Sequence, residues 1–180
     1  MLVCELNSYF FSGVFVQNIL ETTIFSDKLD AENFVCDLVG RAEKRIKIWD
    51  PYVTKNTLQL ISEGVGNKKV EVKILTSEPR IYPDLKHFLK SNISLRVKII
   101  YRKTKNRYES PFHDRYAIVD DAEVWHFGPS LHGAGLREAE MAGQLKREWG
   151  ERILDSFKYN WEKDKESWEL ENWTIREFKN

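Results

Sequence analysis

Apolar positions between residues 28 and 102 switch repeatedly between helical and strand spacing. Apolar residues at intervals of three and four follow Asp27 and Asp30, either of which can cap a helix, and continue to Ala42. Alternating apolar and polar residues then predict strands, and helical patterns separate them. The expected elements are a helix ending near Ala42, a strand at 45–53, a helix at 54–66, a strand at 69–77, a helix at 83–92 and a strand at 94–102.

The regions on either side of this alternation are less regular. Residues 8–20 are rich in Phe, Val and Ile, and Gly13 favours a turn between two short strands. The segment "LREAEMAGQL" at 136–145 fits either a helix or a strand. The remaining expected elements are strands at 113–120 and 123–128 and a strongly amphipathic helix at 149–170.

Helices that alternate with strands favour parallel pairing, because parallel strands need a crossover that a helix supplies. We therefore predict an α/β fold with a mixed, largely parallel sheet flanked by helices. A chain of 180 residues suits one well-packed domain, so 1–180 is interpreted as a single domain with 1–27 as an N-terminal extension. We expect the tail 166–180 to pack back on the domain, because exposure of Trp168 and Trp173 would be costly.

Composition narrows the class of protein. Apolar residues make up 42% and charged residues 31%, with 28 Lys and Arg against 28 Asp and Glu, so only a local patch can attract an anionic partner. Two distant cysteines, Cys4 and Cys36, favour reduced thiols over a disulfide framework or a zinc site. Since no segment has the pattern of a signal peptide or a transmembrane helix, we expect a cytoplasmic protein.

The stretch "ESPFHDRYAIVDDAEVWHFGPSLHGAG" at 109–135 contains the candidate chemistry. Alternation along the first strand places His113 and Arg115 side by side on one face, with Asp114 and Asp120 on the other. An imidazole beside a guanidinium suits phosphate, because Arg binds phosphate oxygens with two donors at once. A polar pair at a strand end is the alternative interpretation.

His113, Arg115 and Asp120 form His-x-Arg-x4-Asp, which resembles the phospholipase D superfamily signature His-x-Lys-x4-Asp-x6-Gly-Ser-x-Asn. The similarity extends over roughly residues 28–165. "AEKRIKIWDPYV" and "VEVKILTS" look like the first two core strands of such domains, and Phe157 with Trp161 looks like the Phe-x3-Trp end of their last helix. The resemblance implies a phospholipase D-like fold and metal-independent phosphodiester chemistry, with no cofactor and no metal site.

The resemblance also implies roles for single residues. His113 would be the nucleophile, Arg115 and Ser130 would hold phosphate, and Glu140 is a candidate to orient the imidazole. We expect Asp120 to tie neighbouring loops, since it faces away from His113. A chain with one motif copy would need a homodimer, in which the second His113 protonates the leaving oxygen.

Two departures from the signature keep a second function open. Arg115 replaces the family Lys, and the Gly-Ser-x-Asn segment is degraded. Aligned without a gap it falls on 127–130, whereas a two-residue insertion pairs Ser130 and His132 with the family Ser and Asn. A single His-Asp-Arg motif is also similar to the phospholipase D-like domains of MIT-domain proteins, which bind lipid without evident catalysis. The alternatives are a phosphodiesterase and a non-catalytic module for nucleic acid, anionic phospholipid or a protein partner.

Residues 96–107, which lead towards His113, contain six Lys or Arg and no acid. We expect Arg102, Lys103, Lys105 and Arg107 to bind the phosphates of an anionic ligand at the rim of the site. His132, in a turn that could cover the site, is a further candidate anion ligand. A solvated loop is the alternative for both segments. His126 is expected to be a partly buried strand residue, and Asp50 is expected to bond backbone amides of the next helix.

Overall fold

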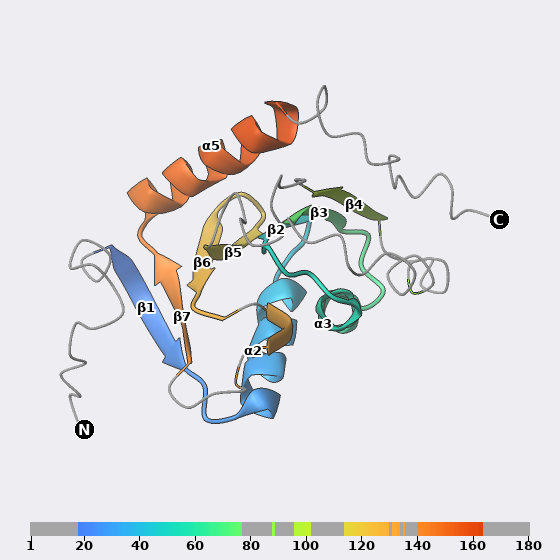
Figure 1. Cartoon of the computed structure of the whole chain (residues 1–180), viewed down its shortest axis with the longest axis vertical. Helices are drawn as coiled ribbons and strands as arrows, with labels where there is room; N and C mark the ends of the chain where they lie inside the picture. The colour runs from blue at the N-terminus through green and yellow to red at the C-terminus, as the bar shows by residue number, and fades with distance from the viewer. Residues whose placement is uncertain are drawn as a thin grey trace, which may run out of the picture.

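The structure is a computed structural model that describes residues 18–76, 88, 96–101, 114–129, 131–133, 135 and 140–163. These residues form a seven-stranded sheet of order β1-β7-β6-β5-β2-β3-β4, with helices on both faces (Figure 1). Its elements are β1 (Ile19–Ile24), α2 (Lys28–Gly40), β2 (Arg45–Trp49), α3 (Lys55–Val65), β3 (Glu71–Thr76), β4 (Arg96–Tyr101), β5 (Arg115–Val119), β6 (Glu123–Phe127), the 3-10 turn η1 (Leu131–Gly133), β7 (Met141–Leu145) and α5 (Arg147–Lys163).

The sheet is mixed, but the prediction that it is largely parallel is wrong. Strands β2, β3 and β4 pair in parallel, as the helix between β2 and β3 led us to expect. All other pairs are antiparallel, namely β2 with β5, β5 with β6, β6 with β7, and β7 with β1. The turn at 120–122 explains part of this difference, because a connection of three residues can join only antiparallel neighbours.

Local signals explain where the two central helices begin. The Asp27 side chain accepts a hydrogen bond from the Asp30 amide at 2.9 Å and caps α2. Thr54 caps α3 in a reciprocal arrangement with Thr57. The two helices pack closely at Gly64, where a Cβ atom would lie 2.3 Å from Val39 Cγ2 and 2.4 Å from the Cys36 carbonyl oxygen. Any larger residue at this position would force the helices apart.

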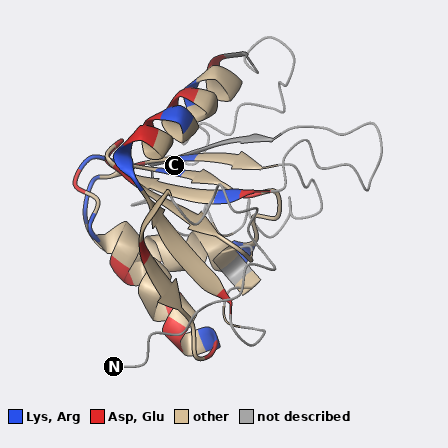
Figure 2. Ribbon diagram, turned by 90° about the vertical axis from the view of Figure 1, so that its left-hand side faces the viewer, with Lys and Arg blue, Asp and Glu red and all other residues tan. Residues whose placement is uncertain are grey.

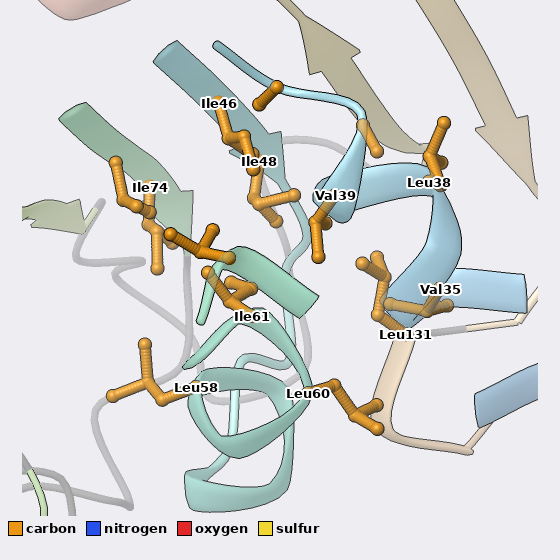
Figure 3. Close-up of a cluster of buried hydrophobic side chains, with 14 of the residues drawn as sticks. Val35, Leu38, Val39, Ile46, Ile48, Leu58, Leu60, Ile61, Ile74 and Leu131 are labelled. Atoms are coloured by element: carbon orange, nitrogen blue, oxygen red, sulfur yellow. The ribbon is translucent and has the colours of Figure 1, made fainter. Parts of the chain in front are cut away.

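The described core consists of two clusters, one on each face of the sheet. Ala117 and Val119 of β5 belong to the cluster under α2 and α3, which Figure 3 shows in part. Tyr116 and Ile118 belong to the cluster under α5, together with Phe157. The alternation of β5 is therefore confirmed, and it places Arg115 on the face that α2 and α3 cover.

The other expected elements have different outcomes. The ambiguous segment 136–145 contains strand β7 at its end, and β1 extends beyond the pair of strands expected at 8–20. The helix expected at 149–170 corresponds to α5, which begins two residues earlier. Residues 1–17, the tail 164–180 and, except for Phe88, the helix expected at 83–92 lie outside the described residues.

Helix α5 is charged along its exposed side. Figure 2 shows residues of both signs on it, and Arg147 forms an ion pair with Glu151 at 2.8 Å one turn further on. Its apolar residues face the sheet, where the Phe157 and Trp161 rings stack with centroids 5.7 Å apart. Within the described residues, no helix combines the length and the apolar character needed to span a bilayer.

Candidate phosphate site

Strands β2 and β6 end, and strands β5 and β7 begin, at one edge of the sheet, where several candidate residues lie. Trp49 of β2 pairs with Tyr116 of β5, so Asp50 and Arg115 follow on adjacent strands. Arg115 pairs with Phe127 of β6, which in turn pairs with Ala142 of β7. Because alternate residues share a face, Glu140 lies on the same side as Ala142, Phe127 and Arg115.

Arg115 is partly buried at this edge and is held from two sides. Its Nη1 donates a hydrogen bond to the Gly128 carbonyl oxygen at 2.9 Å, and its Cζ lies 5.8 Å from the centre of the Tyr52 ring. Its Nε is buried and has no hydrogen-bond partner among the described residues. A buried donor without a partner is costly, so this Nε indicates where an oxyanion or a water molecule would bind.

Glu140 has a similar unpaired atom on the neighbouring part of this edge. Its Oε2 is buried and lacks a partner in the described part of the chain, while its main-chain oxygen accepts a hydrogen bond from the Phe25 amide at 2.9 Å. The main chain therefore holds Glu140 in place, and the carboxylate oxygen Oε2 remains available to accept a hydrogen bond. An imidazole N–H is a suitable donor for such a group.

Asp50 is fully buried, and both carboxylate oxygens accept hydrogen bonds from backbone amides. Oδ1 accepts from Tyr52 at 2.8 Å in the turn before α3, and Oδ2 accepts from Leu131 at 2.9 Å in η1. We expected bonds to backbone amides of the next helix, but the Tyr52 amide lies in the turn before α3. Sequence reasoning missed the bond to Leu131, which joins segments 81 positions apart.

On the opposite face of the same edge, Asp114 lies beside His126. Their nearest oxygen and nitrogen atoms are 3.8 Å apart, and the His126 ring lies 5.2 Å from the Tyr116 ring. The neighbouring His126 lowers the pKa of Asp114, while burial and the charge of Asp114 raise the pKa of Tyr116. His126 is buried, as the strand pattern predicted, and lies under α5, away from the face of Arg115.

Asp120 is at the far end of β5 and has a different environment. Its carboxylate accepts the backbone amides of Glu43, Lys44 and Arg45 at 2.8 to 2.9 Å. Burial acts to raise the pKa of Asp120, but these three hydrogen bonds together outweigh burial and lower it. The residue ties the β5–β6 turn to the loop between α2 and β2.

Several predicted site residues fall in other parts of the chain than those that the structure describes. His113, Ser130, Arg102, Lys103, Lys105 and Arg107 lie outside the described residues. The backbone of His132 lies in η1, but its side chain is outside the described part. The structure thus places Arg115 and Glu140 on one face of this edge, on β5 and just before β7 with β6 between them, and adds Asp50, Tyr52 and Gly128 near Arg115. A buried Asp that ends an apolar strand was the available signal for Asp50.

Comparison with solved structures identifies the architecture. Nuc from Salmonella typhimurium, a phospholipase D family member, is 16% identical, with a TM-score of 0.56 over 82% of this chain and 95% of Nuc. NucT from Helicobacter pylori is 16% identical, with a TM-score of 0.54 over 82% of this chain and 97% of NucT. The chain has the phospholipase D fold. The fold predicted from the motif and its flanking strands is confirmed.

A third solved structure with the same fold is much longer. Phosphatidylserine synthase from Haemophilus influenzae is 14% identical, with a TM-score of 0.53 over 77% of this chain and 36% of the synthase. No protein-family model and no curated protein sequence matches the chain.

Proposed function

We propose that the chain is a phospholipase D-like domain that binds a phosphodiester at the sheet edge formed by Arg115 and Glu140. The observation behind the proposal is the buried Nε of Arg115, which has no partner among the described residues. Arg115 is the first residue of β5 and the Arg of the sequence pattern His-x-Arg-x4-Asp. A phosphate oxygen would satisfy this donor and match the charge of the guanidinium.

In the catalytic form of this proposal, His113 attacks phosphorus. The bond from phosphorus to one ester oxygen breaks, and the leaving oxygen takes a proton from a second His113 in a homodimer. Water then attacks the phosphohistidine and releases a phosphomonoester, so that one diester and one water yield a monoester and an alcohol. Arg115 and Ser130 would stabilise the charge on the nonbridging oxygens, and Glu140 would orient the imidazole.

A non-catalytic module is the second candidate, and one observation favours it. Arg115 stands where the superfamily signature has Lys, and its Nη1 is already engaged by the Gly128 carbonyl. A planar guanidinium held in this way can bind phosphate in one orientation, whereas a flexible ammonium can follow the phosphorus through the reaction. Such a site suits recognition of nucleic acid or anionic phospholipid, or of a protein partner, without turnover.

Hydrolysis in the presence of EDTA separates these candidates. The enzyme should hydrolyse bis(4-nitrophenyl) phosphate, and His113→Ala should abolish turnover, whereas His87→Ala, outside the motif, should leave it unchanged. Binding of an oligonucleotide or of phosphatidylglycerol vesicles without turnover would support the module. If wild type neither hydrolyses nor binds any of these probes, the proposal is wrong.

The homodimer is tested separately by sedimentation equilibrium. We expect a dimer at micromolar concentration, because one motif copy supplies half of a two-histidine site. A strict monomer over this range, together with measurable turnover, would overturn the two-histidine mechanism while leaving phosphate recognition in place.

A further inference from the structure

Asp50 follows β2, the strand beside that of Arg115, and its side chain connects two segments that are far apart in the sequence. One segment is the turn before α3, where the Tyr52 amide donates to Oδ1 and the Tyr52 ring lies against the Arg115 guanidinium. The other is η1, where the Leu131 amide donates to Oδ2. Asp50 is fully buried, so losing either amide would leave a carboxylate oxygen poorly solvated, which is costly.

The segment around Leu131 is anchored to the core as well as to Asp50. The Leu131 side chain is 1% exposed and lies beside Val35 of α2, as Figure 3 shows. Gly135, further along the same connection, approaches the start of α2 so closely that a Cβ atom would lie 2.2 Å from the Asp27 carbonyl oxygen. The backbone of Leu131 is therefore held on one side by the core beside α2 and on the other by Asp50. The bond to Asp50 sets the distance between Leu131 and the end of β2.

Leu131 is flanked in the sequence by Ser130 and His132, the two residues that the degraded Gly-Ser-x-Asn segment pairs with phosphate ligands. We propose that Asp50 is a positioning residue for the phosphate site: its carboxylate fixes the backbone of η1 (Leu131–Gly133) and the Tyr52 support of Arg115 relative to β2. This role rests on the proposed function of the site. A carboxylate suits it because it accepts two amides at once, whereas an amide side chain offers one acceptor oxygen and one donor nitrogen.

The test measures phosphate affinity in folded Asp50→Asn. In the variant, one backbone amide faces the side-chain NH2, so the two segments separate. We expect inorganic phosphate to bind at least about tenfold more weakly than to wild type, in an NMR titration well below the melting temperature of the variant. The backbone amides of residues 131–133 should also exchange with solvent faster than in wild type.

Asp120→Asn is the matched control. Asp120 is also a carboxylate that accepts backbone amides, but at the far end of β5. We expect this variant to lose stability, to bind phosphate as wild type does, and to leave amide exchange at 131–133 unchanged. A purely structural role for Asp50 would give the same result as this control, so equal phosphate affinity in wild type and folded Asp50→Asn overturns the positioning role and leaves the site intact.

A second variant covers the case in which Asp50→Asn does not fold. Tyr52→Ala then decides, because Tyr52 is 38% exposed and its removal spares the core. Weaker phosphate binding in Tyr52→Ala supports the proposal that the turn before α3 positions Arg115. Phosphate affinity equal to that of wild type overturns this proposal. If wild type itself binds no phosphate, the proposed site fails and the positioning role fails with it.

Discussion

Charged side chains at the two ends of strand β5 differ in how far their hydrogen-bonding capacity is used within the described residues. At the C-terminal end, three backbone amides donate to the Asp120 carboxylate. At the N-terminal end, Arg115 has one bond to the Gly128 carbonyl, and its buried Nε has no partner among the described residues. The strand therefore has a satisfied end and an unsatisfied end.

This difference separates a structural residue from a candidate ligand-binding residue within one sequence motif. A polar group whose bonds are all made inside the protein stabilises the fold and has little capacity left for a ligand. A buried donor with an unused bond lowers stability until a ligand or water supplies the acceptor. Asp120 is thus suited to holding loops together, and Arg115 to binding an oxyanion. Changes at either end of the strand should therefore have separable effects.

The largest expected effect follows from removing the Asp120 carboxylate at the satisfied end of β5. Asp120→Ala leaves the amides of residues 43–45 without their carboxylate, and we expect the free energy of unfolding to fall by about 2–3 kcal/mol. Phosphate affinity should not change. Urea denaturation and a phosphate titration of the folded variant check the two parts, and a loss of affinity here would show that the two ends are not independent.

At the unsatisfied end, Arg115→Ala should weaken phosphate binding about 30-fold, equivalent to about 2 kcal/mol. Arg115→Lys keeps the charge and restores the family residue, so binding should survive, and turnover should hold or rise if the protein is an enzyme. Calorimetric titration of both variants measures this.

Arg41→Ala is the matched control for Arg115→Ala, because Arg41 forms an exposed ion pair with Glu123 at 2.8 Å at the opposite end of the sheet. Its phosphate affinity should equal that of wild type, and its stability should change by less than about 1 kcal/mol. Equal affinity in all three arginine variants and wild type would mean that Arg115 is an ordinary polar residue at a strand end.

The basic loop should add affinity at the unsatisfied end without selectivity. Neutralising Arg102, Lys103, Lys105 and Arg107 should reduce the slope of log affinity for single-stranded DNA against log salt by about 0.7 for each phosphate that the loop no longer neutralises. Fluorescence anisotropy measures this slope. The salt concentration is varied from about 50 to about 200 mM, the range over which such binding weakens. An unchanged slope would identify the loop as solvated surface.

The smallest effect is confined to acid. Hydrogen bonds lower the pKa of Asp120 in the folded protein below its unfolded value of about 3.9, so the unfolded state binds the proton more readily. Its contribution to stability is present above the unfolded pKa and is lost as the pH falls through the folded pKa. The difference in unfolding free energy between wild type and Asp120→Asn should therefore shrink below about pH 4. A difference that is constant from pH 7 to pH 3 would contradict this.

Local features were well predicted from the sequence, for a common physical reason. The cap at Asp27, the two faces of β5 and the burial of His126 depend on residues a few positions apart, whose spacing directly sets their direction. The motif with its flanking strands was enough to predict the phospholipase D fold. It also led to Arg115 and Glu140, which the structure places on one face of one edge.

The sequence by itself thus determined the succession of elements from α2 to β3 and the pair β5 and β6, the direction of side chains along β5 and the residue types available for phosphate chemistry. The tertiary structure decided that most strand pairs are antiparallel, that Arg115 is held by Gly128 and Tyr52, and that Asp50 bonds to Leu131. Periodicity does not specify which strand lies beside which, because each face can pack against any complementary neighbour. The Asp50 bond joins positions 81 residues apart, and such a contact exists only after the sheet has assembled.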